Sequence, residues 1–149
     1  MKISELLKGL DCRFVGCQDE DVTGLCYDSR AAAQGQLFFA IRGYQTDGHR
    51  YVPGALASGC AAAVVEQAPD DKGPYIVTPD TRRALAVASN AFFGHPARGM
   101  KLIGVTGTNG KTTVTHLVKG IIEQCEGAKV GLIGTNHILI GGEVIPADR

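Results

Sequence analysis

The sequence carries no excess of charge, because 15 basic and 15 acidic residues give a formal net charge of zero. Nucleic-acid-binding proteins usually have a basic excess, so this balance argues against that class. No segment approaches the ~20 consecutive apolar residues of a membrane helix. The first residues, Met1 to Glu5, also lack the apolar core of a signal peptide. We therefore expect a cytoplasmic protein with neither a nucleic-acid nor a membrane partner.

The sequence also lacks any recognisable metal-ligand spacing. It has an odd number of cysteines, five, and no two of them form a CxxC pair. The four histidines are scattered in the same way. Reduced, mostly structural thiols are the expectation for such a set in a cytoplasmic protein. We predict no zinc site.

The first two thirds of the chain alternate predicted strands with predicted helices. Such alternation favours a three-layer α/β domain over an all-β one. A short N-terminal helix is indicated by apolar residues at i, i+3, i+4 and i+7, beginning at Ile3. Pro53 can open a second helix, and Asp80 can cap a third over about 81–93. Strands are predicted at 22–27, 37–41, 61–65 and 75–77.

The remaining residues predict a second unit after a linker at 95–99. We expect a strand at 102–106, a Gly-rich loop, a helix at about 111–124 and a strand at 130–133, together one βαβ unit of a parallel sheet. A hairpin at 138–145 should turn at Gly141-Gly142. These elements cannot cover both faces of a parallel sheet, so we expect the chain to be part of a longer protein. The predicted domains are 1–97 and a truncated 98–149.

The ten residues from Gly104 to Thr113 read GVTGTNGKTT and predict a nucleotide-phosphate cradle. Glycines let backbone N–H groups turn toward an anion, and the following helix N-terminus adds positive potential. Lys111 supplies a full charge, and Thr112 places a hydroxyl where it can ligate Mg²⁺. The usual pattern has a glycine five positions before Gly110, where this chain has Val105. The loop proper is therefore Gly107-Thr108-Asn109-Gly110-Lys111-Thr112-Thr113.

This variant, TGTNGKTT, resembles the ATP loop of the Mur ligases, the cytoplasmic enzymes that build the peptidoglycan peptide. Two earlier segments, VTGLCYDSR at 22–30 and GQLFFAIRGYQTDGHRYV at 35–52, look like the uridine-nucleotide domain of the MurE branch. The GLIGT run at 131–135 also matches that branch. The resemblance extends over nearly the whole chain. It implies an N-terminal UDP-muramoyl-peptide-binding domain, followed by the start of a central ATP-binding domain.

The resemblance implies an ATP- and Mg²⁺-dependent amide ligase that acts through an acyl phosphate. Such an enzyme adds meso-diaminopimelate or L-lysine to UDP-N-acetylmuramoyl-L-alanyl-D-glutamate, and a further C-terminal domain binds the amino acid. Lys111 would be the catalytic residue that bridges the β- and γ-phosphates, and the amides of Gly107, Thr108, Asn109 and Gly110 would cradle them. Thr112 would bind Mg²⁺, and Thr113 an α-phosphate oxygen. The 149-residue chain alone should not ligate.

The same resemblance implies that Tyr27, Ser29, Tyr44, Gln45 and Thr46 contact the UDP-linked substrate. Their chemistry suits this role, because an amide and hydroxyls can pair with a uracil edge and tyrosine offers a stacking face. Local sequence alone favours a simple turn at Asp28-Ser29. It also favours a surface ion pair between Arg30 and Asp28.

Several alternatives remain open from the sequence. His49 could touch substrate or be a structural loop residue, and His116 is best read as an ordinary residue of a helix face. A MurF-type ligase and a non-catalytic UDP-sugar-binding module with a vestigial loop are the rival functions. A stand-alone P-loop NTPase is disfavoured, because 130–135 holds no acidic Mg²⁺ ligand.

Overall fold

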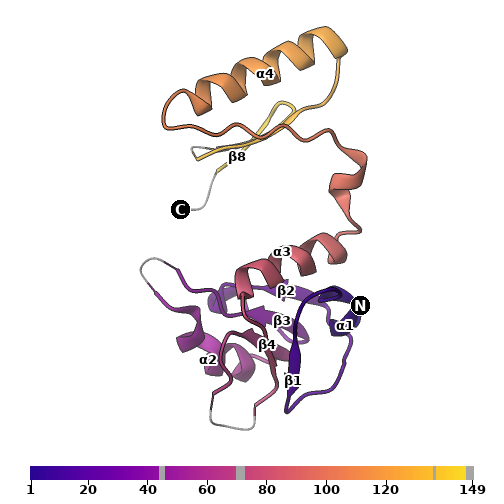
Figure 1. The fold of residues 1–149 in the computed structure, drawn as a ribbon, viewed down its shortest axis with the longest axis vertical. Helices are drawn as coiled ribbons and strands as arrows, with labels where there is room; N and C mark the ends of the chain where they lie inside the picture. Colours follow the sequence, from indigo (N-terminus) through magenta and orange to yellow (C-terminus); the bar gives the residue numbers. More distant parts are fainter. Residues whose placement is uncertain (44–45, 70–72, 136, 147–149) are drawn as a thin grey trace. The chain divides into compact units, whose positions relative to one another are not determined.

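The computed structural model describes residues 1–43, 46–69, 73–135 and 137–146 (Figure 1). The chain divides into two compact units, one of residues 1–100 and one of residues 101–149. Tyr44 and Gln45, two of the predicted substrate contacts, lie outside the described residues.

The first unit is built on a five-stranded sheet with the order β1-β5-β4-β3-β2. Strands β2 to β5 are parallel to their neighbours, whereas β1 pairs antiparallel with β5 at one edge. All four predicted strands are present. The sequence analysis missed β1, which is short and largely exposed. The strands are β1 (Arg13–Val15), β2 (Gly24–Cys26), β3 (Gln36–Phe39), β4 (Ala62–Val65) and β5 (Tyr75–Val77).

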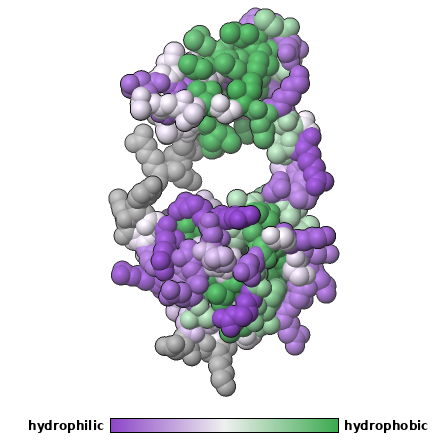
Figure 2. Space-filling view, viewed as in Figure 1, coloured by the Kyte–Doolittle hydropathy of each residue, from purple (hydrophilic) through white to green (hydrophobic). Residues whose placement is uncertain are grey.

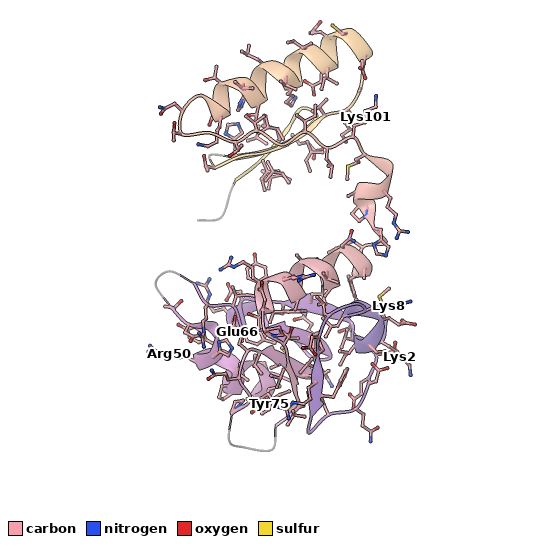
Figure 3. The ribbon with its side chains drawn as sticks, in the orientation of Figure 1. Lys2, Lys8, Arg50, Glu66, Tyr75 and Lys101 are labelled. Carbon is pink, nitrogen blue, oxygen red and sulfur yellow. The ribbon has the colours of Figure 1, made fainter. Side chains whose placement is uncertain are left out.

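Helices cover both faces of this sheet and confirm the predicted three-layer architecture. The strands β3 and β4 are almost entirely apolar, as expected for strands buried on both sides. Leu37 and Phe39 point into one core with α1 (Ile3–Leu6) and α3 (Thr81–Phe92). Phe38 and Ala40 point into the other core with α2 (Val52–Ala57). Figure 3 shows the side chains, including Tyr75 in this second core and Glu66 just after β4.

Aspartate caps begin three of the helical segments in this unit. The Asp80 carboxylate accepts the backbone N–H of Arg83 at 2.8 Å, which confirms the predicted N-cap of α3. Asp28 caps the 3₁₀ turn η1 (Ser29–Ala31), and Asp47 caps the turn η2 (Gly48–Tyr51). Helix α3 ends before Gly94, and the 3₁₀ turn η3 (Pro96–Gly99) follows. The caps of η1 and η2 satisfy backbone N–H groups in the segments that follow β2 and β3.

The second unit consists of α4 (Lys111–Glu126) and a three-stranded antiparallel sheet of β6 (Gly131–Ile133), β7 (His137–Ile140) and β8 (Glu143–Pro146). The predicted helix and the hairpin turn at Gly141-Gly142 are confirmed. The predicted strand at 102–106 is wrong, because those residues pair with no strand in the described ranges. Strand β6 pairs antiparallel with β7 instead. The described ranges therefore contain no parallel strand pair of a βαβ unit in this part of the chain, since a strand forms only with a partner beside it.

The second unit buries little apolar surface. Leu132 is the only hydrophobic residue of its described part that is buried. Along α4, Leu117 and Ile121 are 62% and 61% exposed. Figure 2 shows hydrophobic residues gathered on the visible face of this unit. In the described ranges, no helix combines the length and the apolar character needed to cross a bilayer.

Candidate functional site

The described residues among the predicted substrate contacts follow the carboxyl ends of two parallel strands. Tyr27 and Ser29 come after β2, and Thr46 lies in the loop after β3. Glu66, which the sequence analysis did not predict, follows the next strand, β4. Because β2, β3 and β4 are parallel, these segments leave the sheet at one edge, where ligands of open α/β sheets bind. Tyr27 is 67% exposed. The first unit thus presents a polar edge to a ligand.

Asp28 holds Ser29 in a capped turn. Its Oδ1 accepts the backbone N–H of Arg30 at 3.0 Å, and both carboxylate oxygens pair with the Arg30 guanidinium at 2.6–3.1 Å. The Arg30 side-chain hydrogen bonds lower the pKa of Asp28 to about 2. The predicted surface ion pair is therefore confirmed. Within the described ranges, the Ser29 hydroxyl forms no hydrogen bond, so it is available to a ligand.

The loop after β3 is closed at its base by backbone hydrogen bonds. The N–H of Gly43 donates to Thr46 O at 2.9 Å, and the N–H of Gly48 donates to Ile41 O at 2.9 Å. A Cβ at Gly48 would lie 2.6 Å from Ile41 O, so only glycine fits this close approach. Thr46 is exposed on this loop. The loop thereby presents the one described residue of the predicted 44–46 group.

His49 is held at both ring nitrogens. Its Nδ1 lies 2.6 Å from Asp47 Oδ1, and its Nε2 lies 3.0 Å from the backbone N of Glu66. Because a backbone N–H only donates, Nε2 accepts, and the neutral ring carries its proton on Nδ1. The His49 backbone N–H and then its ring lower the pKa of Asp47. Of the two roles left open by the sequence, the structural one is favoured.

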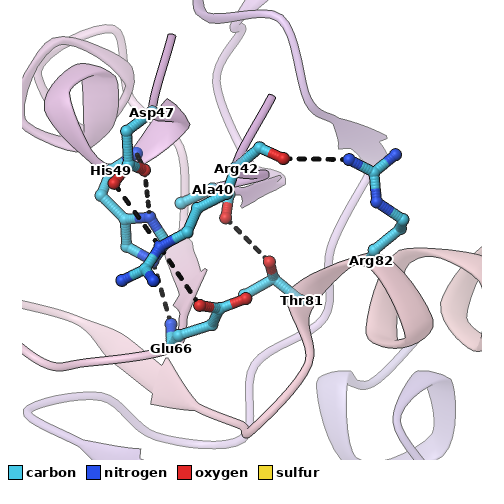
Figure 4. Close-up of polar contacts among 7 residues, drawn as sticks. All are labelled: Ala40, Arg42, Asp47, His49, Glu66, Thr81 and Arg82. Carbon is cyan, nitrogen blue, oxygen red and sulfur yellow. Dashed lines mark hydrogen bonds and ion pairs between the residues drawn. The ribbon is translucent and has the colours of Figure 1, made fainter. Parts of the chain in front are cut away.

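A frame of polar contacts surrounds this loop base (Figure 4). Arg42 Nε lies 3.5 Å from Asp47 and 3.3 Å from Glu66. Arg82 Nη2 donates to the Arg42 carbonyl at 3.0 Å, so α3 also holds the loop. Next to it, buried Thr81 donates its hydroxyl to Ala40 O at 2.9 Å. Sequence reasoning missed Glu66, Thr81 and Arg82 as parts of this site, because each lies far from the loop along the chain.

The phosphate loop leads directly into α4. Gly110 is the N-cap with a φ of 75°, and Gly107 has a φ of 145°, both in the region that glycine adopts readily. The first backbone bond of the helix runs from Val114 N–H to Gly110 O at 2.9 Å. The N–H groups of Lys111, Thr112 and Thr113 precede this bond and have no intrahelical acceptor. This end of the helix is suited to an anion.

The Lys111 ammonium lies over the loop. Its Nζ donates to Gly107 O at 2.5 Å and contacts Thr108 O at 3.4 Å. Thr112 and Thr113 are exposed in the first turn of α4. Thr112 O also accepts from Thr115 and His116. Backbone donors, one ammonium and two hydroxyls therefore gather at one helix end, a set that suits a phosphate with its cation.

The cysteines and the acidic residues form no metal centre in the part of the chain that the structure describes. All five cysteines are free thiols. Burial raises the pKa of the Cys26 and Cys60 thiols above the usual range of a cysteine. No group of three or more potential metal ligands occurs in the described ranges.

Comparison with known families matches both units. The Mur ligase family catalytic domain matches residues 21–113, and the Mur ligase middle domain matches residues 105–144. Two relatives are UDP-N-acetylmuramoyl-L-alanyl-D-glutamate--2,6-diaminopimelate ligases. The one from Caldanaerobacter subterraneus is 42% identical and that from Bacillus licheniformis 43% identical. These matches cover 98% and 99% of this chain, but the chain spans only about 30% of each relative's length.

Solved structures agree with this fold. A structure of a UDP-N-acetylmuramoyl-L-alanyl-D-glutamate--2,6-diaminopimelate ligase matches 98% of the chain and 30% of its own length, with a TM-score of 0.72 at 24% identity. MurF from Acinetobacter baumannii matches 83% of the chain and 27% of its own length, with a TM-score of 0.60 at 29% identity. The first family match alone covers more than half of the 149 residues. The chain therefore belongs to the Mur ligase family.

Proposed function

We propose that the chain supplies the UDP-substrate site and the phosphate loop of a longer, cytoplasmic, ATP-dependent amide ligase. Its substrate would be UDP-N-acetylmuramoyl-L-alanyl-D-glutamate, and its product that nucleotide with a third amino acid attached. The names of the relatives favour 2,6-diaminopimelate over L-lysine as the added amino acid. A site for that amino acid would lie in a further C-terminal domain.

The observation that carries the proposal is the phosphate loop with Lys111 folded over it. The residues fit ATP with Mg²⁺, because the donors at the start of α4 suit phosphate and the Thr112 hydroxyl suits a hard cation. When bound, ATP would supply the phosphoryl group that activates a carboxylate. Lys111 would neutralise and orient the phosphates, Thr113 would hydrogen-bond one of them, and the amides of 107–110 would cradle them.

The first unit supports the other half of the proposal. We assign Tyr27, Ser29 and Thr46 to the UDP-linked substrate, together with Tyr44 and Gln45 outside the described residues. Ser29 and Thr46 lie after β2 and β3 at the carboxyl edge, and both offer hydroxyls. The frame around Arg42, Asp47 and His49 supports the assignment, because it holds the base of this loop.

The exposure of the second unit supports the proposal that more protein is needed. Val114, Leu117 and Ile121 on α4 are all exposed, and a soluble domain rarely leaves so much contiguous apolar surface uncovered. We propose that the rest of a ligase of the relatives' length covers this surface. This proposal also includes a domain boundary near 97–98. Residues 1–97 would bind the UDP-linked substrate, and residues 98–149 would begin the ATP-binding domain.

Calorimetric titration with UDP-N-acetylmuramoyl-L-alanyl-D-glutamate tests the substrate site in the 149-residue chain. Ser29→Ala should weaken binding, because it removes a hydroxyl at the carboxyl edge. Ser58→Ala is the matched control, since Ser58 is exposed at the end of α2. Equal affinity of the two variants, or no binding by the folded wild-type chain, would count against the site.

Turnover of the complete ligase tests the phosphate loop. Lys111→Ala should abolish ATP-dependent ligation, while Lys129→Ala, which removes an exposed lysine of the same unit, should not. Near-normal turnover by Lys111→Ala would contradict the assignment of the phosphate loop. No ATP-dependent ligation by the complete wild-type protein would instead favour the non-catalytic module. Mass analysis of the product separates the proposed activity from a MurF-type one, which would add a D-alanyl-D-alanine dipeptide.

A further inference from the structure

Two histidines of the second unit meet between α4 and β7. His116 Nε2 lies 3.2 Å from His137 Nε2, and the two rings are edge-to-face with centroids 5.3 Å apart. On its other side, His116 Nδ1 lies 2.7 Å from the backbone oxygen of Thr112. A side chain that the sequence placed on an ordinary helix face is thus bonded at both ring nitrogens.

The direction of each bond follows from its partners. A carbonyl oxygen only accepts, so His116 Nδ1 must donate to Thr112. In the neutral ring, His116 Nε2 is then an acceptor, and His137 Nε2–H must be the donor. The result is a chain of two hydrogen bonds with one direction. It runs from His137 on β7 through His116 to the Thr112 carbonyl in the first turn of α4, and we call it the histidine relay.

The first turns of α4 have few other restraints. The N-cap, Gly110, offers no side chain to the helix, and no residue of α4 is buried. Gly120 further weakens the helix interior. Within the described residues, the bond between His116 and His137 is the only hydrogen bond that joins an α4 side chain to a strand. The relay therefore ties the nucleotide end of the helix to the sheet.

We propose that His116 and His137 are positioning residues that hold the first turn of α4, and with it Thr112 and Thr113, in place for the nucleotide. This inference rests on the proposed function of the phosphate loop. Neither histidine is assigned contact with the nucleotide, because His116 acts through the Thr112 backbone and His137 acts through His116. Loss of the relay should weaken nucleotide binding more than it weakens binding of the UDP-linked substrate.

The kinetic test uses the complete ligase and measures KM and kcat with ATP and Mg²⁺. His137→Leu removes the donor and should raise the KM for ATP about 3- to 10-fold, the effect of one lost hydrogen bond. His137→Gln, whose amide nitrogen can take the place of Nε2, should restore the KM to within about twofold. The KM for the UDP-linked substrate should be unchanged in both variants. Gln124→Leu, at an exposed position of α4, is the control.

The outcomes separate this inference from the proposal on which it rests. If Lys111→Ala leaves ligation intact, the phosphate-loop assignment fails. If Lys111→Ala abolishes ligation and His137→Leu leaves the KM for ATP unchanged, the relay alone is overturned. Equal damage by His137→Leu and His137→Gln would also overturn it.

The tautomers give a second, activity-independent readout in the 149-residue chain. Nitrogen-15 NMR of the histidine rings, at a pH where both are neutral, should show the proton of His116 on Nδ1 and that of His137 on Nε2. A His116 ring protonated on Nε2 would contradict the relay whatever the kinetics show.

Discussion

The backbone N–H of Glu66 donates to Nε2 of His49 at 3.0 Å, across 17 residues of sequence. This bond joins the loop after β3 to the end of β4. It also fixes the ring in the tautomer that lets Nδ1 bond Asp47. Both ring nitrogens of His49 therefore have hydrogen-bond partners within the protein. Together these two bonds hold the loop that carries Thr46.

His49→Ala should destabilise the first unit by about 1–2 kcal/mol, because it leaves the Glu66 N–H without its acceptor. All four tyrosines lie in residues 1–100, so tyrosine fluorescence during urea unfolding reports this unit alone. Lys8→Ala, at an exposed position, is the control. An unfolding midpoint equal to that of the control would show that the bond contributes nothing.

Gly48→Ala should destabilise the unit by about 1–3 kcal/mol, since a backbone clash cannot be relieved by a rotamer change. The new Cβ would meet Ile41 O at 2.6 Å and Ile41 N at 2.7 Å. Gly54→Ala is the matched control, because nothing lies within 4 Å of a Cβ there. Gly54 lies within α2, so alanine should stabilise by about 0.5–1 kcal/mol. The two variants should therefore shift the midpoint in opposite directions, and a shift of the same sign would contradict the argument.

The elements that the sequence predicted correctly are those whose signals are local. Asp80 before a helical pattern and the apolar run at 61–65 needed no knowledge of neighbours. The predicted strand at 102–106 failed because an extended apolar run is a strand only beside a partner, and the sheet of β6, β7 and β8 includes none of it. The short strand β1 was missed because three largely exposed residues carry no periodicity.

The same distinction between local signals and long-range contacts applies to the candidate site. Local sequence located the phosphate loop and the turn at Ser29, since glycines, Lys111 and the Asp28 cap all lie within a few residues. The contacts that hold the site could not be predicted. The bond from Arg82 to Arg42 spans 40 residues, and the bond between His116 and His137 spans 21. Neither pair has a sequence spacing that signals a contact, because the fold alone brings the partners together.

Thr81→Val should destabilise the first unit by about 1–2 kcal/mol, although the two side chains have nearly the same shape. The Thr81 side chain is buried, and its hydroxyl donates to Ala40 O at 2.9 Å. Valine cannot donate this hydrogen bond, and at a buried position water does not replace it, so the Ala40 carbonyl would lose a hydrogen-bond donor. Thr46→Val, at an exposed position, should change the urea midpoint little. If the two variants unfold at the same urea concentration, the buried bond has no net effect on stability.

The first unit should lose stability in acid, below about pH 4, the usual pKa of an aspartate. The bonds from Arg30 lower the pKa of Asp28 to about 2, and those from His49 lower the pKa of Asp47. A carboxylate whose pKa is lower in the folded state stabilises the fold above its unfolded pKa. That stabilisation is lost as the pH falls toward the folded value. The window for Asp28 is therefore between about pH 4 and pH 2.

Asp28→Asn should reduce this acid sensitivity. Asparagine can still accept the Arg30 N–H through its amide oxygen, so the cap of η1 is kept while the titrating charge is removed. Urea midpoints from tyrosine fluorescence at pH 6 and pH 3 should differ less in Asp28→Asn than in the wild type. Asp11→Asn, at an exposed position, is the control and should keep the wild-type difference. An unchanged pH dependence in Asp28→Asn would mean that the Arg30 contact does not persist in solution, because a persistent pair must release its stabilisation when Asp28 is protonated.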